Sequence, residues 1–584
     1  MSGPAWLDAT EIRIGLGCMR LSTDPDRDEE VALATIAAAA AAGVTVFDTA
    51  RAYGHSTAEL GHNERLLARA LRRCGAERSA RIVSKGGMAR EGGGWVADGR
   101  AGAILGDCEA SLEDLDGLAI DLYLVHAPDP RTPWRTSVRA LARLLDEGLV
   151  RHVGLGNVNR RQLDEARELV DVTAVQIALS LHDASAIRGG LVEHCAGNGI
   201  AVIAHSPLGG PRRAPGLMRH PVLTEVAEHS GATPAEVALA WLLDLSPAVV
   251  AIPGARRPET ARSAARAASL TLDSGARDDL ARSFGISRPA RVDHLVRRDD
   301  ADVVLVMGIP GAGKSRVADG YIARGHLRLN RDERGGSLRA LAGDLEQALT
   351  SGVRKVVLDN TYLTRAARSH VIDVATRHHL PTRCIWIDTP LAQAQVNIVE
   401  RLLQRCGGKL PSPDELRELA RREAGMLAPA SQMRALRELE PPSTDEGLVD
   451  VEQVTFERIP PSVPGRAGVF VAAAALRHPG WKELVLRGDQ SAPHLVFDWQ
   501  PDGTADALAA CAADLSAVVP GPVQTALCPH AAGPPTCWCR PPLPGLALAF
   551  ARAHSVDPAR SVLIGTGATH RTLARALGAA YISA

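Results

Sequence analysis

Lysine is almost absent from this chain. Only five of its 584 residues are lysine, although lysine and arginine together number 66. Arginine therefore carries nearly every positive charge for which either residue would serve. We expect a lysine that remains to be needed as a compact charge with a tunable pKa, which draws attention to Lys85 and Lys314.

Long apolar runs are missing as well. No stretch approaches the roughly 20 consecutive apolar residues of a membrane-spanning helix. Residues 1–10 lack the basic and then apolar pattern of a secretory signal. The ten cysteines are spread along the chain, unlike those of a disulfide-rich secreted scaffold. These absences exclude a membrane partner and predict a cytoplasmic protein.

The chain also has almost no net charge. A formal charge of −1 argues against a whole-protein field that attracts nucleic acid. Residues 308–437, however, contain 21 Lys and Arg residues against 13 Asp and Glu residues. This local basic excess has the sign expected of a phosphate-binding surface.

What is present indicates a multidomain α/β protein. Hydrophobic residues make up 46% of the chain and charged residues 23%, which is typical of globular domains. A charged segment at 291–302 and a proline-rich segment at 460–464 are candidate linkers. We therefore predict three domains, at residues 1–288, 300–460 and 465–584.

The first domain alternates β-rich runs with helical segments. Eight such runs lie between residues 12 and 285, which predicts a closed parallel (β/α)8 barrel, the TIM barrel. The active site of such a barrel lies at the carboxyl ends of its strands.

Four polar residues lie at or just after the ends of consecutive runs: Asp48, Tyr53, Lys85 and His126. One such residue is usually structural, but four in register favour an active site. Together they resemble the catalytic tetrad of the aldo-keto reductases. Carbonyl reduction needs an acid beside the nascent alkoxide. The resemblance implies that Tyr53 is this acid, that Lys85 lowers its pKa, and that His126 orients a small carbonyl substrate.

The same resemblance implies an NADP(H) site. Asn157 and Gln176 match the nicotinamide contacts, and Arg256 or Arg257 would hold the 2′-phosphate. His205 stands where the family usually stacks a tyrosine on the nicotinamide. The loop Ser206–Gly210 matches the pyrophosphate loop, with Ser206, Leu208 and Gly210 as contacts. The alternative is a barrel that senses the nucleotide without useful turnover.

The second domain begins with a phosphate-binding pattern. The residues GIPGAGKS at 308–315 follow an apolar strand and precede a helical segment, which is the context of a P-loop. Amides around Gly308, Gly311 and Gly313 would cradle the phosphates of ATP. Lys314 would reach the β and γ phosphates, and Ser315 would bind Mg²⁺.

Asn330-Arg331-Asp332 follows the first helix of this domain. It resembles the signature of the polynucleotide 5′-kinases, in which the aspartate is the general base for a 5′-hydroxyl of RNA or DNA. Arg405, and also Arg401, would then belong to a lid over the ATP phosphates. Two alternatives remain open: Asn330 as an ordinary helix cap, and a small-molecule kinase on the same fold.

The third domain contains a metal-binding pattern. Cys528, His530, Cys537 and Cys539 offer three thiolates and an imidazole, the donors of a tetrahedral Zn²⁺ site. The segment resembles the zinc loop of the heptose-bisphosphate and histidinol-phosphate phosphatases, which belong to the haloacid dehalogenase (HAD) class.

The acid pair that such phosphatases need is not where the resemblance requires it. Ala472 and Ala474 occupy the expected positions, which predicts an inactive HAD-like domain. The rival interpretation takes Asp498 and Asp502 as the acids.

These motifs together predict a bifunctional enzyme. It would reduce a carbonyl with NADPH and phosphorylate 5′-hydroxyl ends with ATP, two activities that would serve nucleic-acid end repair. One alternative is a reductase and kinase that act in turn on one small molecule. Another is a barrel that reports NADP(H) status to the kinase.

Overall fold

The computed structural model describes residues 6–91, 94–286, 300–423, 425–455, 465–531 and 535–584. The chain forms two compact units, residues 1–290 with 365–369, and residues 291–364 with 370–584. Most of the predicted linker 291–302 and all of 460–464 lie outside the described residues.

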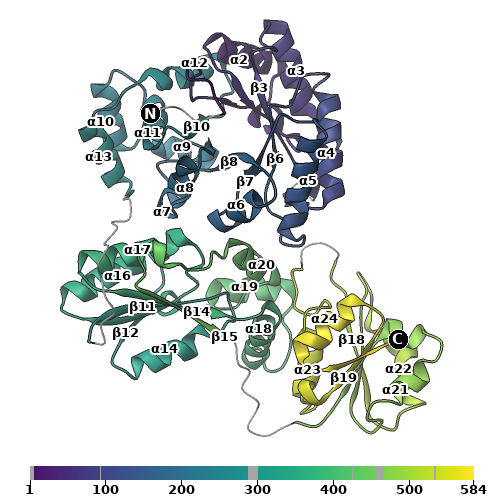
Figure 1. Ribbon diagram of the computed structural model, residues 1–584. Helices are drawn as coiled ribbons and strands as arrows, with labels where there is room; N and C mark the ends of the chain where they lie inside the picture. Colours follow the sequence, from purple (N-terminus) through teal and green to yellow (C-terminus); the bar gives the residue numbers. More distant parts are fainter. Residues whose placement is uncertain (1–5, 92–93, 287–299, 424, 456–464, 532–534) are drawn as a thin grey trace. The chain divides into compact units, whose positions relative to one another are not determined.

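The first unit is an eight-stranded parallel barrel (Figure 1). Its strands occur in the order β1-β2-β3-β6-β7-β8-β9-β10. They are β1 (Leu16–Gly17), β2 (Val46–Asp48), β3 (Arg81–Gly86), β6 (Leu122–Val125), β7 (His152–Gly156), β8 (Val172–Ala178), β9 (Ala201–His205) and β10 (Val249–Ile252). A parallel bridge between Ile14 and Ala251 joins the two ends of the sheet. This closure confirms the predicted (β/α)8 barrel.

Helices surround this barrel because each strand presents side chains to both its faces. One buried cluster fills the barrel and includes Val46, Leu124 and Val250. A larger cluster packs strands against helices. The helices are α1 (Arg20–Thr23), α2 (Glu29–Ala41), α3 (His62–Cys74), α4 (Ala101–Asp114), α5 (Trp134–Asp146), α6 (Arg160–Arg167), α7 (Ser185–Arg188), α8 (Leu191–Gly197), α9 (Gly210–Leu217), α10 (Pro221–His229), α11 (Pro234–Leu245), α12 (Pro258–Arg266) and α13 (Ser274–Ser283). A hairpin of β4 (Met88–Glu91) and β5 (Gly94–Ala97) follows β3.

The second unit contains two further parallel sheets. The first has the order β12-β13-β11-β14-β15. Its strands are β11 (Asp302–Met307), β12 (Leu327–Leu329), β13 (Lys355–Asp359), β14 (Thr382–Asp388) and β15 (Asp450–Thr455). Its helices are α14 (Lys314–Ile322), α15 (Arg331–Arg334), α16 (Leu338–Thr350), α17 (Arg365–Arg377), α18 (Leu391–Arg405), α19 (Pro413–Arg422) and α20 (Pro429–Glu438). The central position of β11 places the glycine-rich turn in the middle of the sheet.

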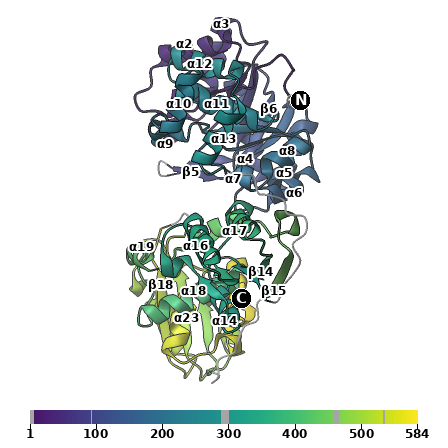
Figure 2. The same ribbon diagram turned by 90° about the vertical axis from the view of Figure 1, so that its left-hand side faces the viewer.

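The other sheet has the order β18-β17-β16-β19-β20. Its strands are β16 (Val469–Ala472), β17 (His494–Trp499), β18 (Val523–Cys528), β19 (Val562–Gly565) and β20 (Ala580–Ser583). Helices α23 (Gly545–Ala553) and α24 (Ala568–Leu577) cover one face, and α21 (Trp481–Val485) and α22 (Ala509–Ser516) cover the other (Figure 1). Helix α18 packs against α23 and α24, and lies beside α23 in Figure 2 as well.

The sequence missed four strands: β4 and β5 of the hairpin, and β15 and β20. Both β15 and β20 lie at sheet edges and are mostly exposed or half-buried, so they lack a continuous apolar run. Among the described residues, no helix combines the length and apolarity needed to cross a bilayer.

Candidate functional site

The barrel brings together the four residues predicted to act on a carbonyl. Lys85 in β3 donates from Nζ to Asp48 Oδ1 at 2.7 Å, and its Nζ lies 3.1 Å from Tyr53 Oη. Lys85 is also bonded to the Thr49 carbonyl at 2.8 Å. His126 follows β6, and its ring centroid lies 5.8 Å from that of Tyr53. The parallel strands therefore deliver these side chains to one mouth of the barrel.

Burial dominates the electrostatics of this site. It raises the pKa of Tyr53 to about 12, although the Lys85 ammonium acts in the opposite direction. Lys85 lowers the pKa of Tyr53, as predicted, but removing the hydroxyl from water has the larger effect, so the net shift is upward. Tyr53 stays protonated at neutral pH and keeps a proton to donate.

Two neighbours of Tyr53 also have shifted pKa values: that of Lys85 is raised and that of His126 is lowered. Burial alone would lower the pKa of Lys85, but the Asp48 carboxylate and Tyr53 raise it above its usual value. Burial, with a smaller effect of Lys85, holds the pKa of His126 well below its usual range. His126 is thus neutral, and its Nδ1 bonds to no group of the described residues.

The predicted nicotinamide contacts adjoin the same mouth. Gln176 donates from Nε2 to Asp48 Oδ1 at 2.6 Å. Asn157 donates to the His126 carbonyl at 3.0 Å, and its Oδ1 lies 3.0 Å from Nε2 of His205. Asn157 and Gln176 are therefore hydrogen-bonded to two of the predicted catalytic residues, His126 and Asp48.

The predicted pyrophosphate loop leads into a helix. Ser206 has a φ of 51°, and Gly209 and Gly210 have φ values of 81° and 72°. Helix α9 begins at Gly210, so the amides of its first turn, except at Pro211, which has no N–H, lack a partner within the helix and are suited to an anion. Leu208 is half-buried beneath this turn of the chain.

The two predicted 2′-phosphate arginines are in different states. Arg256 is 2.5 Å from Asp24 and 3.2 Å from Asp26. Arg257 is exposed and precedes α12. A phosphate would compete with two carboxylates for Arg256, whereas Arg257 is accessible.

The sequence missed Trp95, which belongs to the β4-β5 hairpin. Its ring centroid lies 5.5 Å from that of Tyr53 and 5.7 Å from that of His126. Trp95 is 36% exposed and forms an aromatic wall over the site. Its position in a glycine-rich loop directly after the Lys85 strand is the signal that could have found it.

The glycine-rich turn of the second unit has the geometry of a phosphate-binding loop. It joins β11 to α14, and Lys314 at the helix start donates to the carbonyls of Gly308 and Ile309, both at 3.1 Å. Gly311 has a φ of 86°, and a Cβ there would lie 2.3 Å from the Ala394 carbonyl oxygen. Only glycine fits at this position.

A cavity of about 940 Å³ lies over this loop. It is lined by Lys314, Ser315, Asp332 and Arg401, so the structure brings together the predicted base, the P-loop and one of the two predicted lid arginines. Burial lowers the pKa of Lys314 to about 8, and Arg401 acts in the same direction. A bound polyphosphate would offset this burial penalty.

Asn330 fixes the turn that carries Asp332. It caps α15 by accepting from the Asp332 amide at 2.7 Å, as the helix-cap interpretation predicts. It also donates to Asp359 Oδ1 at 2.9 Å, and Arg328 forms two hydrogen bonds with the same carboxylate. The Asp332 side chain is 48% exposed, and its Oδ1 lies 3.6 Å from Nη2 of Arg331.

The second predicted lid arginine, Arg405, forms an ion pair beside the P-loop. Arg405 Nη1 lies 2.8 Å from Glu423 Oε2, and both residues line a smaller hollow of about 330 Å³ with Ser315 and Asp332. Arg405 therefore lies close to Ser315 and Asp332, but its charge is paired with that of Glu423.

The predicted metal ligands converge. The ligand atoms of Cys528, His530, Cys537 and Cys539 all lie within 4.8 Å of one another. Cys528 Sγ lies 3.7 Å from Cys537 Sγ and 3.4 Å from Cys539 Sγ. Sulfur atoms around tetrahedral zinc are about 3.8 Å apart, because Zn–S bonds are about 2.3 Å long. The donors present therefore fit Zn²⁺.

The predicted phosphatase positions lack acidic groups. Ala472 ends the central strand β16 and is buried. Asp498 lies on the neighbouring strand β17, and Asp502 follows it in a turn with a φ of 59°. The rival acid pair is therefore not on the central strand.

Residues 13–281 match the aldo/keto reductase family, and the chain belongs to this family. An oxidoreductase of Schizosaccharomyces pombe is 30% identical over 268 residues, which are 45% of this chain and 83% of that protein. A probable aldo-keto reductase of Glycine max is 32% identical over 272 residues, which are 41% of this chain and 76% of that one.

Among solved structures, an aldo/keto reductase of Klebsiella pneumoniae in complex with NADP and acetate is 26% identical. It covers 47% of this chain and 91% of its own, with a TM-score of 0.40. Residues 303–422 match the model of an AAA domain. The chain thus joins an aldo/keto reductase barrel to a P-loop-like α/β domain.

Proposed function

We propose that the barrel is an NADPH-dependent reductase of small carbonyl compounds. The observation that carries this proposal is the contact of Tyr53 and Asp48 with the same Lys85 ammonium, at 3.1 and 2.7 Å. A bound reduced nicotinamide would supply the hydride. Asn157 and Gln176 would hold its carboxamide, Ser206–Gly210 its pyrophosphate, and Arg257 its 2′-phosphate.

The residues of the chain would handle the proton. As negative charge develops on the carbonyl oxygen, Tyr53 donates its proton, and the Lys85 ammonium stabilises the phenolate that remains. Neutral His126 orients the same oxygen through a hydrogen bond. Trp95 covers the site and reduces its contact with water.

We further propose that the P-loop domain is an ATP-dependent polynucleotide 5′-hydroxyl kinase. Asp332 would accept the proton of the 5′-hydroxyl while that oxygen forms a bond to the γ-phosphorus and the bond to ADP breaks. Lys314 and Arg401 would neutralise the charge of the transferred group, and Ser315 would hold Mg²⁺. This proposal is supported by the shared cavity of Lys314 and Asp332.

The third sheet is proposed to be a HAD-like domain that holds Zn²⁺ and performs no phosphatase chemistry. Three observations support this: the parallel order with β16 in the centre, the convergent cysteines, and Ala472 at the end of that strand. Release of phosphate from 3′-phosphorylated oligonucleotides by the chain, dependent on Mg²⁺, would contradict this assignment.

One experiment separates the candidate acceptors. Labelled ATP is offered with 5′-hydroxyl RNA or DNA oligonucleotides, and then with sugars and polyols, to the wild-type chain and to Asp332→Ala. We expect transfer to the oligonucleotides and its loss by a factor of about 10² to 10⁴ in the variant. Transfer to small molecules alone would instead favour a reductase and kinase that share one metabolite.

A further inference from the structure

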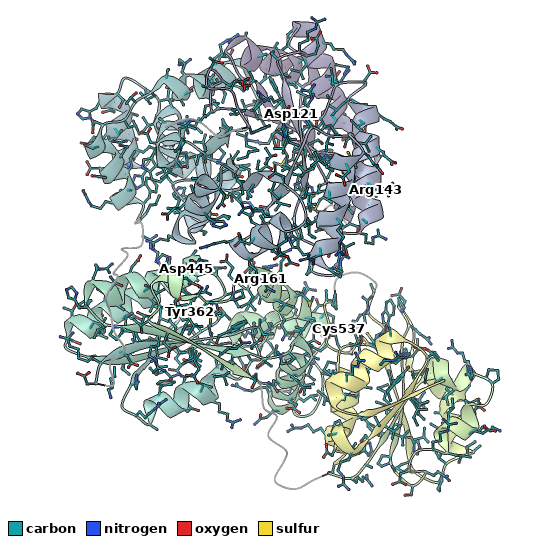
Figure 3. All side chains as sticks on the ribbon, viewed as in Figure 1. Asp121, Arg143, Arg161, Tyr362, Asp445 and Cys537 are labelled. Carbon is teal, nitrogen blue, oxygen red and sulfur yellow. The ribbon has the colours of Figure 1, made fainter. Side chains whose placement is uncertain are left out.

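Trp538 links the metal loop to the nucleotide-binding domain. It stands between the ligands Cys537 and Cys539, yet its side chain leaves the loop and is only 2% exposed. It belongs to a buried cluster with Leu402 and Leu403 of α18. Figure 3 labels Cys537 on the side of the third sheet's domain that faces α18 and α19.

The indole also makes a directional contact. Its Nε1 donates to the Leu427 carbonyl at 2.8 Å. Leu427 lies in the connection between α19 and α20, outside any helix. The hydrogen bond therefore restrains a backbone segment that secondary structure does not hold.

This backbone segment, residues 425–427, forms part of the wall of the nucleotide cavity. Gly425 has a φ of 80°, and a Cβ on it would lie 2.7 Å from Nη1 of Arg401. The segment is thus in contact with the guanidinium that lines the cavity with Lys314. A displacement of 425–427 would move the support of Arg401.

We infer that Trp538 is a positioning residue for phosphoryl transfer: the metal loop holds its indole, the indole holds 425–427, and that segment holds Arg401 toward the ATP phosphates. This inference rests on the kinase function proposed above. It also gives the four metal ligands a use in a domain whose central strand ends in Ala472. Zinc bound by Cys537 and Cys539, the two neighbours of Trp538 in the sequence, would fix the backbone from which the indole projects.

A second contact between the same parts of the unit provides a matched control. Gln393 in α18 donates to the Ala576 carbonyl of α24 at 3.2 Å. This contact joins the P-loop domain to the domain of the third sheet but does not involve residues 425–427. Gln393→Ala therefore perturbs the junction without touching the proposed relay.

The test uses the full chain loaded with zinc, and compares Trp538→Ala, Trp538→Phe and Gln393→Ala with the wild type. We expect Trp538→Ala to raise the KM for ATP and the Kd of a nonhydrolysable ATP analogue about tenfold. Hydrogen exchange at 425–427 should accelerate. Trp538→Phe, which keeps a ring but loses the hydrogen bond, should give a smaller shift, and Gln393→Ala should resemble the wild type.

Removal of zinc by a chelator should reproduce the Trp538→Ala effect on analogue binding and exchange. Wild-type analogue affinity and exchange in both Trp538 variants would overturn the inference, as would an equal loss in Gln393→Ala. If Trp538→Ala does not fold, Trp538→Phe decides by the same two measurements. Failure of the wild type to phosphorylate any oligonucleotide would instead reject the proposed kinase, because analogue binding and exchange do not depend on the acceptor.

Discussion

Tyr53 is the residue on which the proposed reductase chemistry depends. We expect Tyr53→Phe to lower carbonyl reduction by a factor of about 10² to 10⁴, because the variant keeps the ring and loses only the proton. Steady-state NADPH oxidation measures the loss. Binding of NADPH, followed by fluorescence, should change little, and phosphoryl transfer by the same variant should equal that of the wild type.

We expect ATP binding to the P-loop domain to depend on pH through Lys314. Burial lowers its pKa to about 8, so the ligand-free residue loses its charge as the pH rises through that value. ATP requires the charged form and raises the pKa on binding, so affinity should be constant below about pH 7 and fall above pH 8. The slope should approach tenfold per pH unit. Titration of the analogue Kd over a pH range that brackets the pKa of about 8 measures this dependence.

The control for this pH effect is Lys314→Arg, whose charge does not titrate in that range. A flat profile in the wild type, or the same decline in Lys314→Arg, would contradict the assignment of the effect to this ammonium.

Single residues were predictable from sequence where one strand end fixes their place. Asp48, Lys85 and His126 each follow or end a buried strand, so the barrel alone brings them together. Trp95 was missed because a separate hairpin carries it over the site. The sequence indicated the effect of Lys85 on the pKa of Tyr53 but not the larger effect of burial, because the depth of burial depends on packing around the whole mouth.

At the scale of elements, the turn between β11 and α14 depends on a close approach to α18. We expect Gly311→Ala to abolish detectable ATP analogue binding and to lower the thermal midpoint, because its Cβ would meet the Ala394 carbonyl at 2.3 Å and its φ is 86°. Calorimetry and analogue titration measure the two effects.

Gly320→Ala, in the helix that follows this turn, provides the comparison. Gly320 lies inside α14, and a Cβ there would meet no atom within 4 Å. This substitution should stabilise the chain by about 0.5–1 kcal/mol and leave binding unchanged. A loss of stability in Gly320→Ala equal to that in Gly311→Ala would show that the loss does not come from the close approach at Gly311, contrary to this argument.

Elements were predictable where an apolar run marks them. The central strands of all three sheets have such runs, and the sequence located them. Strand β15 has the residues DVEQVT and is half-exposed, and β20 is exposed or half-buried along its whole length, so neither has a continuous apolar run. Edge strands of this kind are defined by the neighbour with which they pair.

At the scale of the whole molecule, the division into two units predicts two separable unfolding transitions. NADPH should raise the midpoint of one and ATP that of the other, each by the equivalent of about 2.7 kcal/mol at a ligand concentration of 100 times Kd. Removal of zinc should lower the midpoint of the transition that responds to ATP, since the metal loop belongs to that unit. Differential scanning calorimetry checks this, and a single transition raised by both ligands would be the contrary result.

The bridge between Ile14 and Ala251, which closes the barrel, has a consequence for folding during translation. The ribosome must make roughly 240 residues between these partners, which takes roughly 10 to 50 seconds at about 5–20 residues per second. The nascent sheet stays open for that time, with its first edge lacking a neighbour. Because β1 has only two residues, that edge offers little backbone to a wrong strand while the last one is translated.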